Sequence, residues 1–165
     1  MNLTTLELRI RDRLEPEWLT PSQEVVWRKL HRFSGPPHRI INVYGIHGSG
    51  KSFLGWLMGR ERYATYGSWS NPPKATAPRL VLDNSRTDRA STRDIRPLVD
   101  RQGISQIILL SRQRVDEPAM PAFELAVSAE DVEQMRANFY RYLDIIIPEG
   151  EYGNYSEAVE AVLTR

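Results

Sequence analysis

One eight-residue segment, from Gly45 to Ser52, carries two glycines, a lysine and a serine at the spacing G-x-x-x-x-G-K-S. Glycines let the backbone wrap closely around phosphate groups, and the amides that open the following helix attract negative charge. Lys51 would place a cation at the β- and γ-phosphates, and the Ser52 hydroxyl would ligate magnesium. The segment therefore predicts a loop that binds a nucleoside triphosphate with Mg²⁺. The residues expected to contact the nucleotide are Gly45, His47, Gly48, Ser49, Gly50, Lys51, Ser52 and Phe53. His47 occupies a variable position of the motif, and we expect it to be solvated rather than catalytic.

A phosphate loop of this kind needs a carboxylate that holds the metal ion and orients water. Asp83 follows the apolar run at 80–82 and would emerge at the same edge of a sheet as the loop. We therefore predict Ser52 and Asp83 as the metal ligands. Asn84 stands directly after Asp83, where many hydrolysing proteins carry a glutamate base. Because an amide cannot accept a proton from water, we expect slow hydrolysis unless Asp88 or a residue of another subunit substitutes.

A third apolar run, at 107–110, ends in the polar pair Ser111 and Arg112. If this run is a strand between the loop strand and the Asp83 strand, Ser111 could reach the attacking water or the γ-phosphate. Arg112 could then sense the γ-phosphate, although a surface Ser-Arg turn explains the same residues. The predicted catalytic residues are Lys51, Asp83, Ser111 and Arg112.

Apolar runs that alternate with helical patterns must position these residues. Strands are predicted at 39–44, 79–82, 104–110 and 123–127, with a short edge strand near 63–66. Helices are predicted at 22–33, 53–60, 91–101, 128–143 and 154–163, while residues 3–14 fit either period. The predicted helix caps are Ser22, Ser91 or Thr92, Ser128, and Asn154 or Ser156. Buried strands alternating with helices indicate an α/β fold, a three-layer αβα arrangement around a mostly parallel central sheet.

The length of 165 residues suits one domain, with an N-terminal helical segment at 1–38, a nucleotide-binding core at 39–127 and C-terminal helices at 128–165. The chain has no cysteine, which excludes disulfides and thiolate zinc sites. No apolar run is long enough to span a membrane, and the charged N-terminus is unlike a secretory signal. We therefore expect a soluble protein of the cytoplasm.

The basic residues are almost all arginine, since only three of the 22 are lysine. Four arginines follow Asp83 closely: Arg86, Arg89, Arg93 and Arg96. One helix face could therefore be basic, and two functions compete for it: contact with DNA phosphates, or an arginine finger for a neighbouring subunit's nucleotide. A solvated helix with ion pairs to the interleaved aspartates is a third interpretation.

The segments GIHGSGKS, LVLDN, IILLSR and FELAVSAEDVEQMRANF, preceded by a helix, resemble the nucleotide-binding core of AAA-like and STAND (NB-ARC-like) P-loop ATPases. The resemblance covers about 22–142. It implies ATP as the nucleotide, a loop strand flanked by the Ser111 strand, and a switch or motor role with protein partners or in a homo-oligomer. We expect no counterpart of the usual helical lid and effector regions within these 165 residues. A core of this size is similar to the small ATPase subunits of bacterial anti-phage systems such as BREX.

Two other functions remain open on the residues. A small-molecule or nucleoside kinase can be this short and carry the same loop, but it needs an acidic acceptor site, and the connection at 63–78 contains no acidic residue. A nucleotide-binding scaffold without turnover is compatible with Asn84, which removes the usual base and leaves binding intact.

Overall fold

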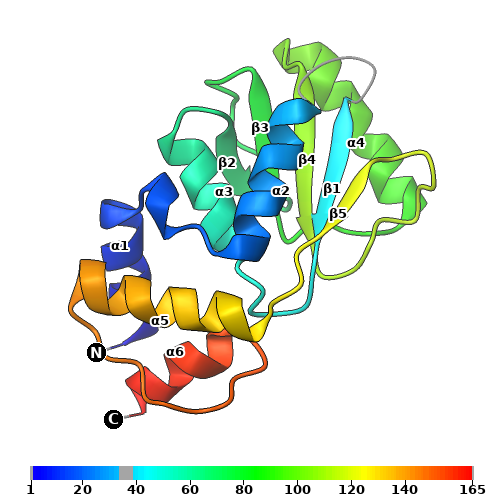
Figure 1. The fold of residues 1–165 in the computed structure, drawn as a ribbon. Coiled ribbons are helices and arrows are strands. Elements are labelled where there is room, and N and C mark those ends of the chain that lie inside the picture. Colours follow the sequence, from blue (N-terminus) through cyan, green and yellow to red (C-terminus); the bar gives the residue numbers. More distant parts are fainter. Residues whose placement is uncertain (1, 34–38, 165) are drawn as a thin grey trace.

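A parallel sheet of five strands forms the centre of the protein in the computed structural model, which describes residues 2–33 and 39–164 (Figure 1). The strands lie in the order β2-β3-β4-β1-β5. Their bounds are β1 Ile40–Tyr44, β2 Thr65–Ser68, β3 Arg79–Asp83, β4 Gln106–Ser111 and β5 Ala122–Glu124. All four pairings are parallel, so the carboxyl ends of the strands meet at one edge of the sheet. The predicted α/β fold with a parallel sheet is confirmed.

Strand β4 lies between β1 and β3, with Ile41 opposite Ile108 and Leu80 opposite Ile107. The sequence predicted this arrangement only through the family resemblance, and the structure confirms it. The last predicted strand is shorter than expected: β5 ends at Glu124, and the chain then leaves the sheet toward the next helix. The edge strand lies two residues later than its predicted start.

The helices are α1 Leu3–Arg13, α2 Pro21–Arg32, α3 Lys51–Arg60, α4 Arg89–Gln102, α5 Ala129–Leu143 and α6 Tyr155–Leu163, with a 3₁₀ turn η1 at Pro16–Trp18. Helices α2 and α3 cover one face of the sheet and α4 covers the other (Figure 1). Alternate strand residues supply the two apolar layers between them, because neighbouring side chains on a strand point to opposite faces. The result is the expected three-layer arrangement.

Helices α1, α5 and α6 form a further group at the lower left of Figure 1, on the side of the carboxyl end of β1. One apolar cluster holds the group together, with Leu6 and Ile10 from α1, Met135 from α5 and Ala158 from α6 all buried. Trp18 of η1 is 2% exposed and belongs to the same cluster. The beginning and the end of the described chain therefore pack together next to the phosphate loop.

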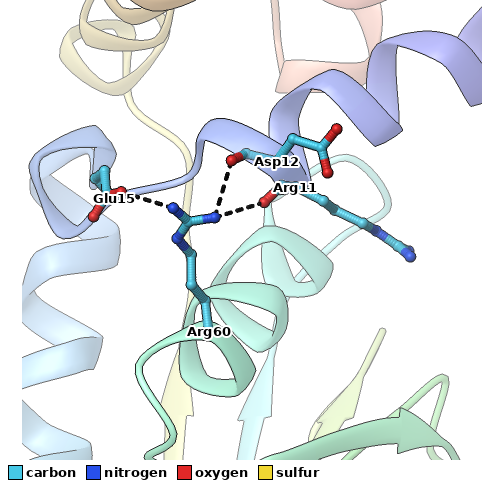
Figure 2. Close-up of polar contacts among 4 residues, drawn as sticks. All are labelled: Arg11, Asp12, Glu15 and Arg60. Carbon is cyan, nitrogen blue, oxygen red and sulfur yellow. Dashed lines mark hydrogen bonds and ion pairs between the residues drawn. The ribbon is translucent and has the colours of Figure 1, made fainter.

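Arg60, the last residue of α3, fixes the C-terminus of α1 to the sheet domain (Figure 2). Its guanidinium donates to the carbonyl oxygens of Arg11, at 3.3 Å, and Asp12, at 3.0 Å, and pairs with Glu15 at 2.8 Å. A cation is favourable here because the last carbonyl groups of a helix have no partner within it. The helix that follows the phosphate loop is thereby joined to α1.

Two of the predicted helix caps are wrong. Thr20, not Ser22, precedes α2, and Ser22 instead donates from its amide and its hydroxyl to Asp131 of α5. Asp88, not Ser91 or Thr92, caps α4, and its carboxylate accepts from the amide of Ser91 at 2.8 Å. Both errors arise because several residues at a helix start can cap it, and tertiary contacts select one. The predicted caps Ser128 and Asn154 are confirmed.

Among the residues that the structure describes, no helix is both long enough and apolar enough to cross a membrane.

Candidate nucleotide-binding site

The phosphate loop connects the end of β1 at Tyr44 to the start of α3 at Lys51. Gly48 and Gly50 adopt left-handed backbone conformations, with φ of +75° and +83°, which disfavour residues with a side chain. At Gly45, an added Cβ atom would lie 2.5 Å from the carbonyl oxygen of Leu125. The three glycines are therefore required by the backbone path as well as by the space that a phosphate needs.

The start of α6 lies directly on the phosphate loop. The amide of Tyr155 donates to the carbonyl oxygen of Gly48 at 3.0 Å, and a Cβ atom on Gly50 would lie 2.7 Å from the Tyr155 ring. The Tyr155 hydroxyl lies 2.7 Å from the Thr20 hydroxyl, next to the start of α2. Burial raises the pKa of the Tyr155 phenol, so the phenol stays protonated. Sequence reasoning missed Tyr155, which carries no motif and is far from the loop along the chain.

The Lys51 side chain folds back onto the phosphate loop. Its ammonium group donates to the carbonyl oxygens of Gly45 and Ile46, both at 2.7 Å, and to the Ser49 hydroxyl at 3.0 Å. Burial lowers the pKa of Lys51, the charge of Asp83 acts in the opposite direction, and the charge of Arg112 lowers the pKa further. A phosphate group beside this ammonium would favour its charged form.

Asp83 is the last residue of β3 and is 6% exposed. One carboxylate oxygen accepts from the Tyr66 hydroxyl at 2.6 Å, and the other accepts from the backbone amide of Asn84 at 2.7 Å. Since Val81 belongs to the apolar layer shared with α3, Asp83 points to the same face of the sheet as the phosphate loop. Asn84 has a φ of +55° and is exposed.

The residues at this edge fit a magnesium ion. Ser52 and Asp83 line the same cavity, and no cluster of three or more histidine, cysteine or acidic residues occurs in the described part of the chain. Mg²⁺ in nucleotide sites takes one or two protein oxygens and completes its shell with phosphate oxygens and water. One hydroxyl and one carboxylate therefore form a suitable donor set.

The polar pair that ends the Ser111 strand is divided between the two faces of the sheet. Arg112 lines the cavity together with Lys51 and Asp83. The Ser111 hydroxyl instead donates to the carbonyl oxygen of Gln113 at 2.6 Å and accepts from the Asn42 side chain at 2.8 Å. The structure thus brings Arg112 to the other predicted catalytic residues and does not bring Ser111 there.

A cavity of about 390 Å³ unites these groups with the helices beside the loop. Its polar lining includes His47, Gly48, Gly50, Lys51, Ser52, Asp83, Asn84 and Arg112, together with the acidic residues Glu7 and Glu160. Its apolar lining includes Leu6, Trp18, Phe53, Trp56, Met135 and Phe139. Gly45 and Ser49 lie outside the lining, and Ser49 is fully buried. This combination of charged and apolar residues can hold a phosphorylated ligand with an aromatic group.

The arginines that follow β3 lie away from this cavity. Arg86 precedes α4, and the other three lie on it at positions 89, 93 and 96, a spacing that places them on one helix face. All four are exposed, and Arg89 lies 3.7 Å from Glu117. The helix covers the opposite face of the sheet from the phosphate loop helix (Figure 1).

No protein-family model and no curated protein sequence matches this chain. Among solved structures, the chain is similar to a replication initiator DnaA bound to AMPPCP and single-stranded DNA, with a TM-score of 0.61 at 11% identity over 92% of this chain and 65% of that one. It is also similar to a DNA replication initiation factor, with a TM-score of 0.57 at 14% identity over 86% of this chain and 58% of that one. AMPPCP-bound DnaA from Aquifex aeolicus gives a TM-score of 0.57 at 15% identity over 88% of this chain and 64% of that one.

The chain therefore spans between about half and two thirds of the length of these structures. At such low identity the similarity concerns the fold. The chain has the αβα fold of P-loop ATPases, with its phosphate loop, its Asp83 strand and its Arg112 strand meeting at one edge of the sheet.

Proposed function

We propose that this protein binds ATP with Mg²⁺ and hydrolyses it slowly, as a switch or motor subunit of a larger complex. The observation that carries the proposal is the convergence of Lys51, Ser52, Asp83 and Arg112 on one cavity. Lys51 and Ser52 open the helix after β1, Asp83 ends β3 and Arg112 directly follows β4; because these three strands are adjacent, the fold brings the residues together.

The mixed lining of the cavity supports ATP as the ligand. The triphosphate would lie against the loop amides and Lys51, and the base would lie against the apolar residues beside Trp18 and Phe53. Two structures of the same fold were solved with AMPPCP, a nonhydrolysable ATP analogue, which supports ATP as the nucleotide here.

Each of the converging residues has a separate role in this proposal. Lys51 would exchange its contacts with Gly45 and Ile46 for β- and γ-phosphate oxygens. Ser52 and Asp83 would hold the magnesium ion, which neutralises phosphate charge when bound. Arg112 would contact the γ-phosphate, while Ser111 supports the backbone before it through Asn42 and Gln113.

Slow turnover is supported by the absence of a base beside Asp83. Asn84 lines the cavity where hydrolysing proteins of this kind carry a glutamate, and an amide accepts no proton from water. Asp88, the alternative that the sequence offers, uses its two carboxylate oxygens to accept from the backbone amide and hydroxyl of Ser91 and caps α4. A partner subunit would therefore supply the missing group.

We further propose that the complex is cytoplasmic and associated with DNA, as in bacterial anti-phage systems of the BREX type. The arginine face of α4 supports this setting, together with a fold shared with a DNA replication initiator bound to single-stranded DNA. Phosphate contacts by exposed arginines give affinity for nucleic acid without sequence preference.

The proposal is tested by ATP binding and turnover of the purified protein, with and without DNA, while its mass in solution is recorded. Lys51→Ala should weaken ATP binding by more than about 100-fold, because two hydrogen bonds from a charged group contribute about 3–6 kcal/mol. Lys74→Ala, which changes an exposed lysine in the loop before β3, is the matched control and should bind as the wild type does.

Each outcome of this experiment has a separate meaning. Equal ATP affinity in Lys51→Ala and the wild type would contradict the loop assignment. Binding without turnover, with or without DNA and partner, would favour the scaffold function, which Asn84 also supports. Arg112→Ala should lower turnover more than binding if Arg112 contacts the γ-phosphate.

A further inference from the structure

The carboxylate of Asp83 is held by a residue of the edge strand β2. The hydroxyl of Tyr66 donates to one carboxylate oxygen at 2.6 Å, and the backbone amide of Asn84 donates to the other at 2.7 Å. Each carboxylate oxygen has two acceptor positions, so each of these bonds leaves one position for a metal ion. Both oxygens are thereby oriented without being blocked.

Tyr66 lies on β2 at the level of Val81, two residues before Asp83 on the neighbouring strand. In the register of β2 and β3, Tyr66 lies opposite Val81, while Ser68 lies opposite Asp83. Because residues two apart on a strand share a face, Tyr66 and Asp83 both point toward α3. A long side chain with a terminal hydroxyl is what this distance requires.

Glycine in the phosphate loop helix makes space for the Tyr66 ring. A Cβ atom on Gly55 of α3 would lie 2.5 Å from one ring carbon of Tyr66 and 2.7 Å from the next. Gly55 is buried in the middle of the helix, where glycine is less favourable than alanine by about 1 kcal/mol. The space for the ring is therefore maintained at a cost to the helix.

The Tyr66 hydroxyl is the donor in this contact, because an ionised carboxylate can only accept hydrogen bonds. Its effect on Asp83 is to orient the carboxylate.

We infer that Tyr66 is a positioning residue for magnesium: its hydroxyl holds Asp83 in the orientation that the metal ion of the bound nucleotide requires. This inference rests on the proposed function, since it concerns the metal ligand of that same site. Residues that orient a metal-binding side chain commonly change metal affinity by about 10- to 100-fold when they are altered. The affinity of the loop for phosphate without metal should not depend on Tyr66.

The test compares Mg²⁺ dependence with nucleotide binding in the absence of metal. Binding of a fluorescent ATP analogue is measured in EDTA and then during a Mg²⁺ titration, for the wild type, Tyr66→Phe and Tyr63→Phe. Tyr66→Phe keeps the ring against Gly55 and removes one oxygen atom. Its Mg²⁺ concentration for half-saturation should rise about 10- to 100-fold, with unchanged affinity in EDTA.

Tyr63→Phe is the matched control, because the Tyr63 hydroxyl donates to the carbonyl oxygen of Leu30 and not to Asp83. It should leave both measurements as in the wild type. Gly55→Ala approaches the same contact from α3 and should reproduce the Mg²⁺ defect if the variant folds, which circular dichroism establishes. If Gly55→Ala does not fold, Tyr66→Phe decides alone.

Failure of the role inferred for Tyr66 can be told apart from failure of the proposed function. Equal Mg²⁺ half-saturation in Tyr66→Phe and the wild type, with nucleotide bound by both, overturns the role of Tyr66 and leaves the proposed function intact. Equal losses of Mg²⁺ dependence and metal-free affinity also overturn it, because they indicate a structural role. A wild type that binds no nucleotide under either condition contradicts the proposed function itself.

Discussion

At the scale of single residues, Lys51 is held by the loop that it serves. Its three donor contacts, to two carbonyl oxygens and one hydroxyl, keep the ammonium group against the loop. Such contacts orient a flexible side chain before a ligand arrives, which reduces the entropy lost on binding. Phosphate oxygens carry more charge than these acceptors and would therefore compete well for the same ammonium group.

Asn84 is the residue that limits ATP hydrolysis in the proposed function. The residue lines the cavity and follows the predicted metal ligand Asp83, but its amide cannot serve as a base. Its backbone is left-handed, with φ of +55°, a conformation that asparagine tolerates better than most residues. Side-chain chemistry and backbone conformation thus both distinguish this position from one that carries a glutamate.

Asn84→Glu should raise the rate of ATP hydrolysis, because it places a carboxylate base where water can be activated, an effect of about 100-fold or more where the geometry allows it. The variant should also lose about 1 kcal/mol of unfolding free energy, since glutamate is strained in the left-handed region. Steady-state phosphate release and urea denaturation measure the two effects. Asn84→Gln is the control, with the same length and no base, and should hydrolyse no faster than the wild type. Equal rates in both variants would place the base elsewhere.

At the scale of helices and strands, one buried carboxylate joins the starts of α2 and α5. Asp131 accepts hydrogen bonds from the amides and hydroxyls of Ser22 and Ser128, at 2.7 to 2.8 Å. It is fully buried. The positive ends of both helices also favour its charge. The N-terminal segment and the C-terminal helices are therefore tied together at one residue.

Asp131→Ala should lower the free energy of unfolding by about 3 kcal/mol, because it leaves donors of Ser22 and Ser128 without their partner. Burial acts to raise the pKa of Asp131, but the hydrogen bonds from Ser128 and Ser22 outweigh it and hold the pKa below 3.8. A depressed folded-state pKa means that this stabilisation is present above pH 3.8 and is lost as the pH falls through the lower value.

Urea denaturation at pH 7 and at several values below pH 3.8 measures both effects of Asp131. The difference between the wild type and Asp131→Ala should shrink in the acid range. Glu133→Ala is the control on the same helix, where an exposed ion pair with Arg136 contributes about 0–1 kcal/mol. A difference that is independent of pH would show that Asp131 acts without its charge.

The basic face of α4 belongs to the element scale, because it needs a helix to align its arginines. Arg93→Ala with Arg96→Ala should weaken binding to DNA and reduce the salt slope by about 2, since each phosphate contact contributes about 0.9. Arg28→Ala with Arg32→Ala removes the same charge from α2, on the other face of the sheet, and should leave the slope unchanged. Fluorescence anisotropy at several salt concentrations provides the measurement. Equal slopes in the two double variants would remove α4 as the contact.

Sequence patterns predicted those elements whose signal is local. The phosphate loop, the Asp83 strand and the α5 cap at Ser128 follow from motif, hydrophobic runs and capping chemistry within a few residues. Ser22 was misassigned as a cap because its partner, Asp131, lies far along the chain. Tyr66 and Tyr155 were missed for the same reason: their contacts with Asp83 and the loop exist only after the sheet and the helices have assembled.

At the scale of the whole molecule, the cavity is built jointly by the sheet domain and the helical group. The phosphate loop and α3 supply part of the lining, and α1, α5 and α6 supply another part. Arg60 links α1 to the loop helix (Figure 2). Arg9 of α1 donates to the carbonyl oxygen of Leu143 at the end of α5. A ligand in this cavity would therefore contact segments from both ends of the described chain.

ATP with Mg²⁺ should stabilise this helical group more than the rest of the protein. Binding only to the folded state adds about 2.7 kcal/mol at a ligand concentration 100 times Kd, and segments that contact the ligand open less often. Hydrogen exchange should slow in α6, where the Tyr155 amide donates to the loop, and change little in α4, which lies across the sheet. Lys51→Ala at the same ligand concentration is the control and should show much weaker protection, because its lower affinity leaves most of the stabilisation unrealised. Equal protection of α4 and α6 would indicate that the ligand stabilises the protein globally, and that α6 opens only together with the sheet.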